Sequence, residues 1–270
     1  MKNFNKLTEK IIDITYDKKH YKIKFSFCTL VTNMEQYQKM VNSCLIKGFT
    51  HEDTEFLYIN NCHKNYFDAY SGIKHFFEVA RGEYIILCHQ DLVLEFDDRS
   101  ILEKRLGELT KIDPYWMMAG NAGGGHPKSY SYKITTKNDE ALDTKQFPFL
   151  ARSLDENFII VSRKWSPTIS CDLHGFHLYG TELCQLARIS GHKSYVIDFH
   201  LKHYGTGKAD ERFYHEKRAL IQKYARALKH VYIQTTCTRL LIISGTLRAK
   251  ILNNAFFMFI AKEFYKLTNK

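Results

Sequence analysis

The fold is decided by the stretch Glu83-Tyr84-Ile85-Ile86-Leu87-Cys88-His89-Gln90-Asp91, in which an apolar run ends directly on three polar residues. A short, continuous apolar run is typical of a strand that is buried on both faces of a sheet. Two similar runs precede it, and a segment with helical spacing follows each of them. The expected order is strand 22–32, helix 34–47, strand 55–59, helix 66–80 and strand 83–88. This alternation predicts an α/β domain with a parallel sheet and helices packed against it.

Polar residues follow each of these strands, at Thr29–Asn33, Asn60–Cys62 and His89–Asp91. Ligands of parallel sheets bind beyond the carboxyl ends of the strands, so these residues are candidates for a binding site. A carboxylate such as Asp91 can hold a hard divalent cation, which in turn neutralises the charges of a nucleoside diphosphate. The alternative is that Asp91 only caps a turn.

The chain beyond Asp91 has a weaker pattern. Strands are expected at 115–119, 157–161 and 194–199, and helices at 100–110 and 179–190, with a helical region from 210 to 270. Residues 129–146 are polar and poorly patterned. Gly123-Gly124-Gly125 lacks the Gly-Lys-Ser/Thr ending of a phosphate-binding P-loop. We expect a flexible loop over a bound sugar or acceptor there, with ordinary turn glycines as the alternative.

The composition indicates a globular protein of the cytosol. The 270 residues are 44% hydrophobic and 25% charged, which is enough for one large α/β domain or one domain with an appended piece. Met1–His20 has no apolar run typical of a secretory signal, and no apolar run reaches the roughly 18 residues of a membrane span. The 7 cysteines form no Cys-x-x-Cys pair. Zinc binding through such pairs is therefore not expected. The cysteines are expected to be reduced thiols.

The net charge of +10 favours an anionic partner but does not identify which kind. Nucleic acid, anionic lipid and the phosphates of a sugar donor all fit, and a solvated basic surface is the plain alternative. A nucleic-acid-binding protein is one hypothesis, since the chain also holds 19 Phe and 17 Tyr. Against it, the basic residues are spread along the chain and no RNA- or DNA-binding signature is present, so no nucleic-acid partner is expected.

Several segments, in order along residues 22–207, resemble GT-A family 2 glycosyltransferases. They are Phe25–Asn33, Ala69–Ile73, Ala80–Ile86 with His89-Gln90-Asp91, Gly175–Cys184 and Leu201–Gly207. Within that family the chain looks most like a bacterial branch with a His-Gln-Asp variant of the Asp-x-Asp motif. The resemblance implies a GT-A fold, Rossmann-like, with a mostly parallel central sheet flanked by helices. It also implies a transferase domain at 1–209, with a nucleotide-sugar half at about 22–120 and an acceptor half at about 121–209. A helical extension at 210–270 would follow.

The resemblance also implies roles for single residues. A nucleotide sugar, with UDP as its nucleotide, would be bound by Thr29, Leu30, Val31, Asn60, Asn61, Ser71, Gly72, His89, Gln90 and Asp91. Asp91 would hold Mn²⁺ or Mg²⁺, with His203 as the second ligand and His174, His177 or His200 as substitutes for it. His89 stands where the common motif has its first aspartate, so the metal site would have one fewer carboxylate. Glu182 would be the general base of an inverting sugar (hexosyl) transfer, with Asp172 as the competing carboxylate.

The acceptor is expected to be a saccharide or a polyprenyl-linked saccharide of bacterial surface polysaccharide, such as capsule or lipopolysaccharide. Asp155, Glu156 and His177 are candidates for the acceptor side, and the first two are equally well explained as exposed residues. The tail from Thr238 mixes apolar with basic residues, as in helices that lie on anionic membranes. A cytoplasmic protein, peripheral at the inner face of the plasma membrane, is therefore expected, unless the tail packs on the core or on a second subunit. His89 motivates the remaining alternative, a catalytically degenerate GT-A partner subunit.

Overall fold

The computed structural model describes residues 21–205 and 209–268. Met1–His20, and Thr206 and Gly207 of the last motif, lie outside the described residues. The chain divides into two compact units, Met1–Lys208 and Ala209–Lys270. Among the described residues, no helix combines the length and the apolar character that crossing a bilayer requires.

The first unit is built on a seven-stranded sheet with the order β2-β1-β3-β11-β5-β12-β9. Its strands are β1 (Ile23–Val31), β2 (Thr54–Asn60), β3 (Gly82–Cys88), β5 (Trp116–Gly120), β9 (Phe149–Ala151), β11 (Phe158–Ser162) and β12 (Lys193–Val196). β11 and β9 run opposite to the other strands. The mostly parallel α/β sheet that the sequence predicts is therefore confirmed.

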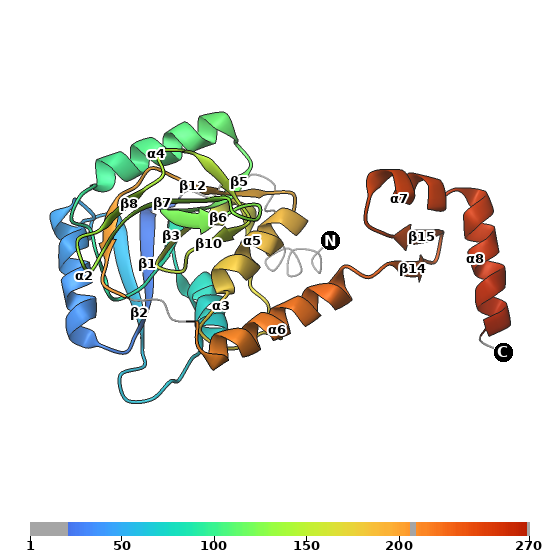
Figure 1. Cartoon of the computed structure of the whole chain (residues 1–270), viewed down its shortest axis with the longest axis horizontal. Coiled ribbons are helices and arrows are strands. Elements are labelled where there is room, and N and C mark those ends of the chain that lie inside the picture. Colours follow the sequence, from blue (N-terminus) through green and yellow to red (C-terminus); the bar gives the residue numbers. More distant parts are fainter. Residues whose placement is uncertain (1–20, 206–208, 269–270) are drawn as a thin grey trace, which may run out of the picture. The chain divides into compact units, whose positions relative to one another are not determined.

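Helices cover both faces of this sheet (Figure 1). They are α2 (Met34–Ile46), α3 (Ala69–Val79), α4 (Arg99–Ile112) and α5 (Tyr179–Ile189), with a short 3₁₀ helix η1 (Arg163–Trp165). β1 alternates, so that Phe25 and Phe27 enter one core with Met40 of α2 and Leu102 of α4. Leu30 faces the other side, where a side chain at Gly72 of α3 would lie 2.8 Å from its Cδ2. Gly72 is therefore what allows α3 to pack closely on β1.

A buried carboxylate, Glu55, fixes the start of β2 to β1 and to the residue before β3. Glu55 is only 9% exposed and accepts hydrogen bonds from the Ser26 hydroxyl (2.7 Å), the Arg81 backbone amide (2.7 Å) and Arg81 Nε (2.8 Å). Burial by itself raises the pKa of Glu55, but these hydrogen bonds and the Arg81 charge outweigh it, and the pKa lies below the ordinary value. The carboxylate therefore stays charged in the folded protein, because its hydrogen bonds stabilise that form.

A second sheet contains much of the segment that the sequence leaves without pattern. Its order is β10-β6-β7-β13-β4, with β8 paired to β7. The strands are β4 (Leu92–Val93), β6 (Ala122–Gly124), β7 (Tyr130–Thr136), β8 (Ala141–Asp143), β10 (Ser153–Leu154) and β13 (Leu201–His203). The expectation of a flexible glycine loop is wrong, because Gly123 and Gly124 lie in β6. A side chain at Gly123 would lie 2.5 Å from the Ser153 carbonyl oxygen, so close strand packing explains this glycine.

The C-terminal unit contains α6 (Glu211–Ala227), α7 (Thr246–Leu252) and α8 (Ala255–Thr268). It also contains a hairpin of β14 (Val231–Gln234) and β15 (Arg239–Ile242), which the expectation of a wholly helical region missed. β14 contains Val231 and Ile233, whose branched side chains favour extended backbone. Asn253 joins the hairpin to α7, since its side chain bonds both the amide (2.7 Å) and the carbonyl (2.9 Å) of Leu241.

Candidate metal centre

Strand pairing brings together two segments that are more than a hundred residues apart in the chain. β3 ends at Cys88, and His89 and Asp91 follow in the turn before β4. β13 pairs antiparallel with β4 and places His203 opposite Leu92. The Tyr204 amide donates to the Asp91 carbonyl (2.9 Å), which fixes the two backbones at this point. His203 thus lies beside Asp91 because the second sheet returns to the end of β3.

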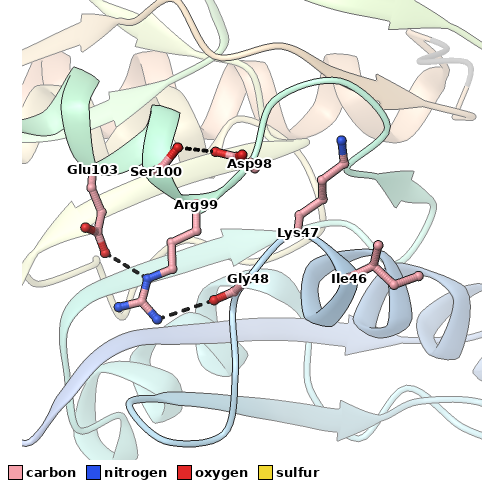
Figure 2. Close-up of a pocket in the computed structure, with 7 residues that line it drawn as sticks. All are labelled: Ile46, Lys47, Gly48, Asp98, Arg99, Ser100 and Glu103. Carbon is pink, nitrogen blue, oxygen red and sulfur yellow. Dashed lines mark hydrogen bonds and ion pairs between the residues drawn. The ribbon is translucent and has the colours of Figure 1, made fainter.

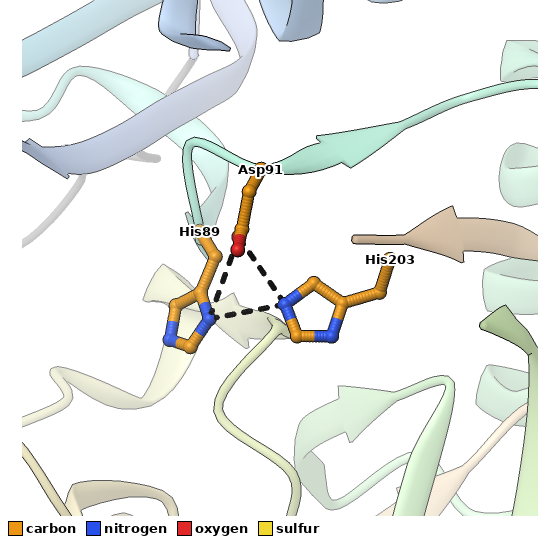
Figure 3. A group of neighbouring side chains, drawn as sticks. All are labelled: His89, Asp91 and His203. Atoms are coloured by element: carbon orange, nitrogen blue, oxygen red, sulfur yellow. Dashed lines mark hydrogen bonds and ion pairs between the residues drawn. The ribbon is translucent and has the colours of Figure 1, made fainter. Parts of the chain in front are cut away.

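Three ligand atoms converge there (Figure 3). His203 Nε2 lies 3.2 Å and His89 Nδ1 lies 4.0 Å from Asp91 Oδ1, and the two nitrogens are 3.4 Å apart. Side chains of His89, Asp91 and His203 form the candidate metal cluster of the described residues. Two imidazoles and one carboxylate are a donor set that transition-metal ions accept.

Gly205 keeps the space beside this cluster free. A Cβ at this position would lie 2.7 Å from His203 Nε2 and 2.8 Å from Asp91 Oδ2, closer than real Cβ atoms approach their neighbours. Position 205 therefore requires glycine because of the neighbouring side chains. The backbone does not require it, because the φ of Gly205 is not positive. The donor set and the space beside Gly205 both fit a bound divalent ion.

The protonation states of the cluster follow from burial and from its hydrogen bonds. Burial raises the pKa of the Asp91 carboxyl, but the hydrogen bond from His203 and the electrostatic effect of the two histidines outweigh it, and the pKa lies below its usual value. The pKa of His89 is lowered, first by the surrounding protein atoms and then by His203, against the opposing effect of Asp91. Asp91 is therefore ionised near neutral pH and His89 is neutral, which are the forms that bind a metal.

Tyr179, the first residue of α5, contacts the His89 ring nitrogen that faces away from the cluster. Its hydroxyl donates to the Glu156 carbonyl oxygen (3.0 Å) and lies 3.2 Å from His89 Nε2. The side chain is buried, and burial raises the pKa of the phenol well above its ordinary value. The hydroxyl therefore keeps its proton. The residue before it, Leu178, has a φ of +64°, an uncommon conformation for a residue other than glycine.

Gln90 joins the turn after β3 to the loop after β1. Its Oε1 accepts from the backbone amides of Thr32 and Asn33, both at 2.8 Å, and its Nε2 donates to the Thr32 hydroxyl at 2.8 Å. The expected role of Gln90 is contact with the nucleotide sugar. The structure shows that its side chain holds two strand ends together.

The residues expected at the nucleotide share one edge of the sheet, but differ in exposure. Val31 pairs with Asn60 in the register of β1 and β2, so their ends lie side by side. Thr29 and Val31 are buried, with 1% and 0% of their surface exposed. Leu30 is partly exposed. Asn60 is exposed, and its Oδ1 accepts from the Cys62 amide (3.0 Å).

Asn61, Ser71 and Gly72 are occupied in building the neighbouring loop and helix. Asn61 is 4% exposed, and its side chain bonds the Phe67 carbonyl (2.8 Å) and the Tyr66 amide (3.0 Å). Ser71 lies in the first turn of α3, where its amide donates to the capping Asp68 carboxylate (2.8 Å). Of the three, Ser71 alone is exposed. The predicted contacts of all three with a ribose or diphosphate stay predictions.

Glu182, the expected base, is fully buried in the first turn of α5. Its Oε1 accepts a hydrogen bond from the Ser170 hydroxyl, and its Oε2 is buried without a partner among the described residues. The competing Asp172 is exposed. In this structure the Glu182 carboxylate is therefore closed to solvent.

The expected acceptor residues lie close to His89. Asp155 and His177 both act electrostatically on the His89 ring, and Glu156 accepts from the Gly180 amide (3.3 Å) at the start of α5. Asp155 is exposed, and its Oδ1 accepts from the Asn157 amide (3.0 Å).

Two of the histidines considered as substitutes for His203 lie elsewhere. His174 is 3.5 Å from Asp68 at the start of α3, and His200 Nε2 is 2.8 Å from the Thr135 hydroxyl.

Three residues of this candidate site are not identified as such by the sequence. The sequence predicts that His89 leaves one fewer carboxylate, and the structure adds that its ring lies among the candidate ligand atoms. Its position two residues before Asp91 was the available signal. Gly205 follows His203 by two residues, but nothing local shows what the glycine faces. Tyr179 gave no signal, because a tyrosine at a helix start is ordinary.

A hollow of about 430 Å³ lies elsewhere, between the end of α2 and the start of α4 (Figure 2). Its charged groups are already paired. Arg99 bonds both carboxylate oxygens of Asp53 (2.6 Å each) and Glu103 (2.8 Å), and Lys47 donates to the Phe96 carbonyl (2.8 Å). Asp53 directly precedes β2, so this hollow lies at the edge of the sheet opposite His89. It presents no unpaired polar group among these residues for a ligand.

A curated protein of Fuscovulum blasticum, described as "ATP synthase subunits region ORF 6", is 34% identical to this chain over 217 residues. The alignment covers 78% of this chain and 87% of that protein. The chain belongs to the family of this protein. Its description states no activity, and no family model matches the chain.

Two solved structures share the fold. The mannosyltransferase PcManGT from Pyrobaculum calidifontis, in complex with GDP-Man and Mn²⁺, matches with a TM-score of 0.51 and 9% identity over 83% of this chain and 69% of that chain. S. aureus TarS 1-349, in complex with UDP-GlcNAc, matches with a TM-score of 0.50 and 13% identity over 75% of this chain and 67% of that chain. At these identities the likeness concerns the fold alone. The chain has the GT-A fold that the sequence predicts.

Proposed function

We propose that this chain is a metal-dependent, inverting glycosyltransferase of GT-A family 2, in the branch with a His-Gln-Asp motif. It transfers a hexosyl group from a nucleotide sugar, with UDP as the nucleotide, to a saccharide or lipid-linked saccharide of bacterial surface polysaccharide. Residues about 22–120 form the nucleotide-sugar half, and residues about 121–209 form the acceptor half. The fold supports this proposal, and so do the nucleotide sugars bound by the two structural neighbours.

The convergence of His89, Asp91 and His203 at the carboxyl end of β3 carries the proposal. In a sheet of this topology, ligands bind at this edge. Asp91 and His203 would hold Mn²⁺ or Mg²⁺, and the bound ion would neutralise the diphosphate of the donor as it departs. Leu30 and Asn60 lie at the adjacent strand ends, and Asn60 offers an exposed amide for the edge of a nucleobase.

Proton removal from the acceptor hydroxyl is assigned to Glu182, by resemblance. This carboxylate is buried and accepts a hydrogen bond from Ser170, so an acceptor would reach it only after a local rearrangement. Asp155 is the carboxylate near His89 that needs no such movement, since it is already exposed. Asp155, Glu156 and His177 would line the acceptor side.

The C-terminal unit is proposed to contact an anionic membrane from the cytoplasmic side. Leu247 of α7 and Phe256 and Phe259 of α8 are 60–69% exposed, so nothing in their own unit covers them. Arg248 and Lys250 lie on the same two-helix segment. Cosedimentation with vesicles that contain anionic lipid tests this, and neutralising both charges (Arg248→Gln with Lys250→Gln) removes about 2 kcal/mol of attraction, or about 30-fold in binding. Equal binding of the neutralised variant would contradict the membrane contact.

The enzymatic proposal is tested by calorimetry with UDP and a panel of UDP-sugars, with and without Mn²⁺, followed by assays of donor hydrolysis. Binding that requires the ion, and that is lost in Asp91→Asn, is expected. Asn keeps the shape of the side chain and removes its charge, so the comparison isolates the carboxylate. Absence of nucleotide binding with and without metal would refute the proposal. Nucleotide binding without any transfer or hydrolysis, and unchanged glycans in cells carrying Asp91→Asn, would favour the degenerate partner subunit instead.

A further inference from the structure

The hydroxyl of Tyr179 has one proton and two neighbours. The Glu156 carbonyl oxygen, 3.0 Å away, has no proton to give, so a favourable contact there requires the phenol to donate. The second neighbour, His89 Nε2, lies 3.2 Å from the same oxygen. Because the phenol proton is already committed, this contact is a hydrogen bond only if Nε2 carries the proton and donates it to the phenol oxygen.

This assignment fixes the chemistry of the opposite ring nitrogen. A neutral imidazole carries one N–H, so the proton on Nε2 leaves Nδ1 with a bare lone pair. Nδ1 is the atom that faces Asp91 Oδ1 and His203 Nε2, at 4.0 Å and 3.4 Å (Figure 3). The lone pair of His89 therefore points at the position where the two other candidate ligands meet.

We propose that Tyr179 is a positioning residue that holds His89 as a third metal ligand through Nδ1, and that the resulting two-imidazole, one-carboxylate site selects a transition-metal ion such as Mn²⁺ over Mg²⁺. This inference rests on the proposed metal-dependent function. It adds to that function the role of His89, its orienting partner and the class of ion.

The selectivity follows from the donor atoms. Mg²⁺ is a hard cation that favours oxygen ligands and retains its waters, so it gains little from imidazole nitrogen. Mn²⁺ and Co²⁺ accept imidazole together with carboxylate, and the Irving–Williams order places Co²⁺ above Mn²⁺ for such donors. Replacing the first aspartate of an Asp-x-Asp motif by histidine thus exchanges one oxygen ligand for a nitrogen ligand. The exchange is effective only if the lone pair points at the ion, and the Tyr179 hydrogen bond provides that orientation.

The test measures metal binding directly on the full chain. Mn²⁺ is titrated by the loss of its free-ion electron paramagnetic resonance signal, with Mg²⁺ as competitor, in the presence and absence of UDP. Electron spin-echo modulation of bound Mn²⁺ then counts the coordinated nitrogens. Tyr179→Phe removes only the hydroxyl. Tyr195→Phe is the matched control, because its buried hydroxyl bonds the Asp113 carboxylate (2.9 Å) and no residue of the cluster.

We expect two coordinated nitrogens in the wild type and competition by Mg²⁺ only at large excess. Tyr179→Phe should weaken Mn²⁺ binding by about 10–100-fold, the usual effect of losing a partner that orients a ligand, while Tyr195→Phe leaves it unchanged. A single nitrogen in the wild type, or equal affinity for Mg²⁺, overturns the inference even if Tyr179→Phe fails to fold. Unchanged affinity in Tyr179→Phe overturns the positioning role and leaves the proposed function intact. A wild type that binds UDP but no Mn²⁺ refutes the metal dependence of the proposed function itself.

Discussion

Gly205→Ala is the sharpest steric perturbation of the candidate metal centre. The added methyl carbon would lie 2.7 Å from His203 Nε2 and 2.8 Å from both Asp91 Oδ2 and His203 Cε1. Ordinary contacts of this kind begin at 3.4 Å, so these atoms must withdraw by about 0.6–0.7 Å. The φ of Gly205 is not in the left-handed region, so alanine meets no comparable obstacle in the backbone.

The size of the effect follows from the tolerance of metal coordination. Ligand distances in metal sites hold within about 0.2 Å, so the required displacement is roughly three times that tolerance. We therefore expect Mn²⁺ affinity to fall by at least the 10–100-fold that is typical of disturbed ligand orientation, about 1.4–2.7 kcal/mol. The melting temperature should change little, because Gly205 lies in the partly exposed turn after β13, outside the buried core.

The assay is the Mn²⁺ titration, with thermal melting measured on the same samples. Gly107→Ala is the control, because Gly107 lies inside α4 and a Cβ there would meet nothing within 4 Å. Alanine in a helix interior stabilises by about 0.5–1 kcal/mol relative to glycine, so this variant should melt higher and bind Mn²⁺ unchanged. Wild-type Mn²⁺ affinity in Gly205→Ala would refute the placement of the ion between His203 and Asp91.

Three further perturbations test other parts of the site and fold. Gln90→Ala leaves two backbone amides of the loop after β1 without their acceptor, and should lower stability by about 1–2 kcal/mol in chemical denaturation while raising the Km for the donor. Glu55 has a folded-state pKa below its unfolded value, so its stabilisation is complete above the ordinary glutamate pKa of about 4.3 and is lost as pH falls through the folded pKa. Glu55→Gln should therefore have a lower melting temperature than the wild type at neutral pH and lose less stability on acidification. The same dependence of melting temperature on pH in both proteins would contradict this. Glu182→Gln should lower kcat by about 10²–10⁴-fold with donor affinity kept, and a comparable loss in Asp155→Asn instead would reassign the base to Asp155.

The first half of the fold was predictable because local and tertiary preferences agree there. β1 and β3 are largely buried apolar runs, and α2 and α3 have clear apolar sides and stops. The largest local error was at the start of α3, which begins at Ala69 rather than at Tyr66. There Asp68 is the N-cap, so the residues before it form a turn. A cap of this type depends on one side chain and is weaker than apolar periodicity as a signal.

The second sheet was not predictable for a physical reason. β6 is a run of Ala-Gly-Gly, and the strands of the second sheet are only two to seven residues long. Glycine has low intrinsic strand propensity, so such a segment becomes a strand only through its neighbours. At Gly123 the decisive neighbour is Ser153, about thirty residues later in the chain. No local pattern carries that information.

The same limit explains which site residues the sequence identified. Asp91 lies at the end of a strong strand, so position alone made it a ligand candidate. His203 was inferred only by resemblance, and its closeness to Asp91 depends on the pairing of β13 with β4. Glu182 was placed correctly on a helix start, yet no pattern shows that its carboxylate is buried beneath Ser170. Exposure of a polar side chain is a tertiary property.

His89 shows why a departure from a motif has to be judged in three dimensions. In the sequence, histidine in place of aspartate lowers the number of carboxylates and suggests a weakened or inactive site. In the structure, the imidazole faces Asp91 and His203, and the Tyr179 hydroxyl lies against its far nitrogen. A degenerate site gains nothing from such a support, because an unused histidine needs no fixed tautomer. The hydrogen-bond chain from the Glu156 carbonyl through Tyr179 to His89 therefore argues for an exchanged ligand rather than a lost one.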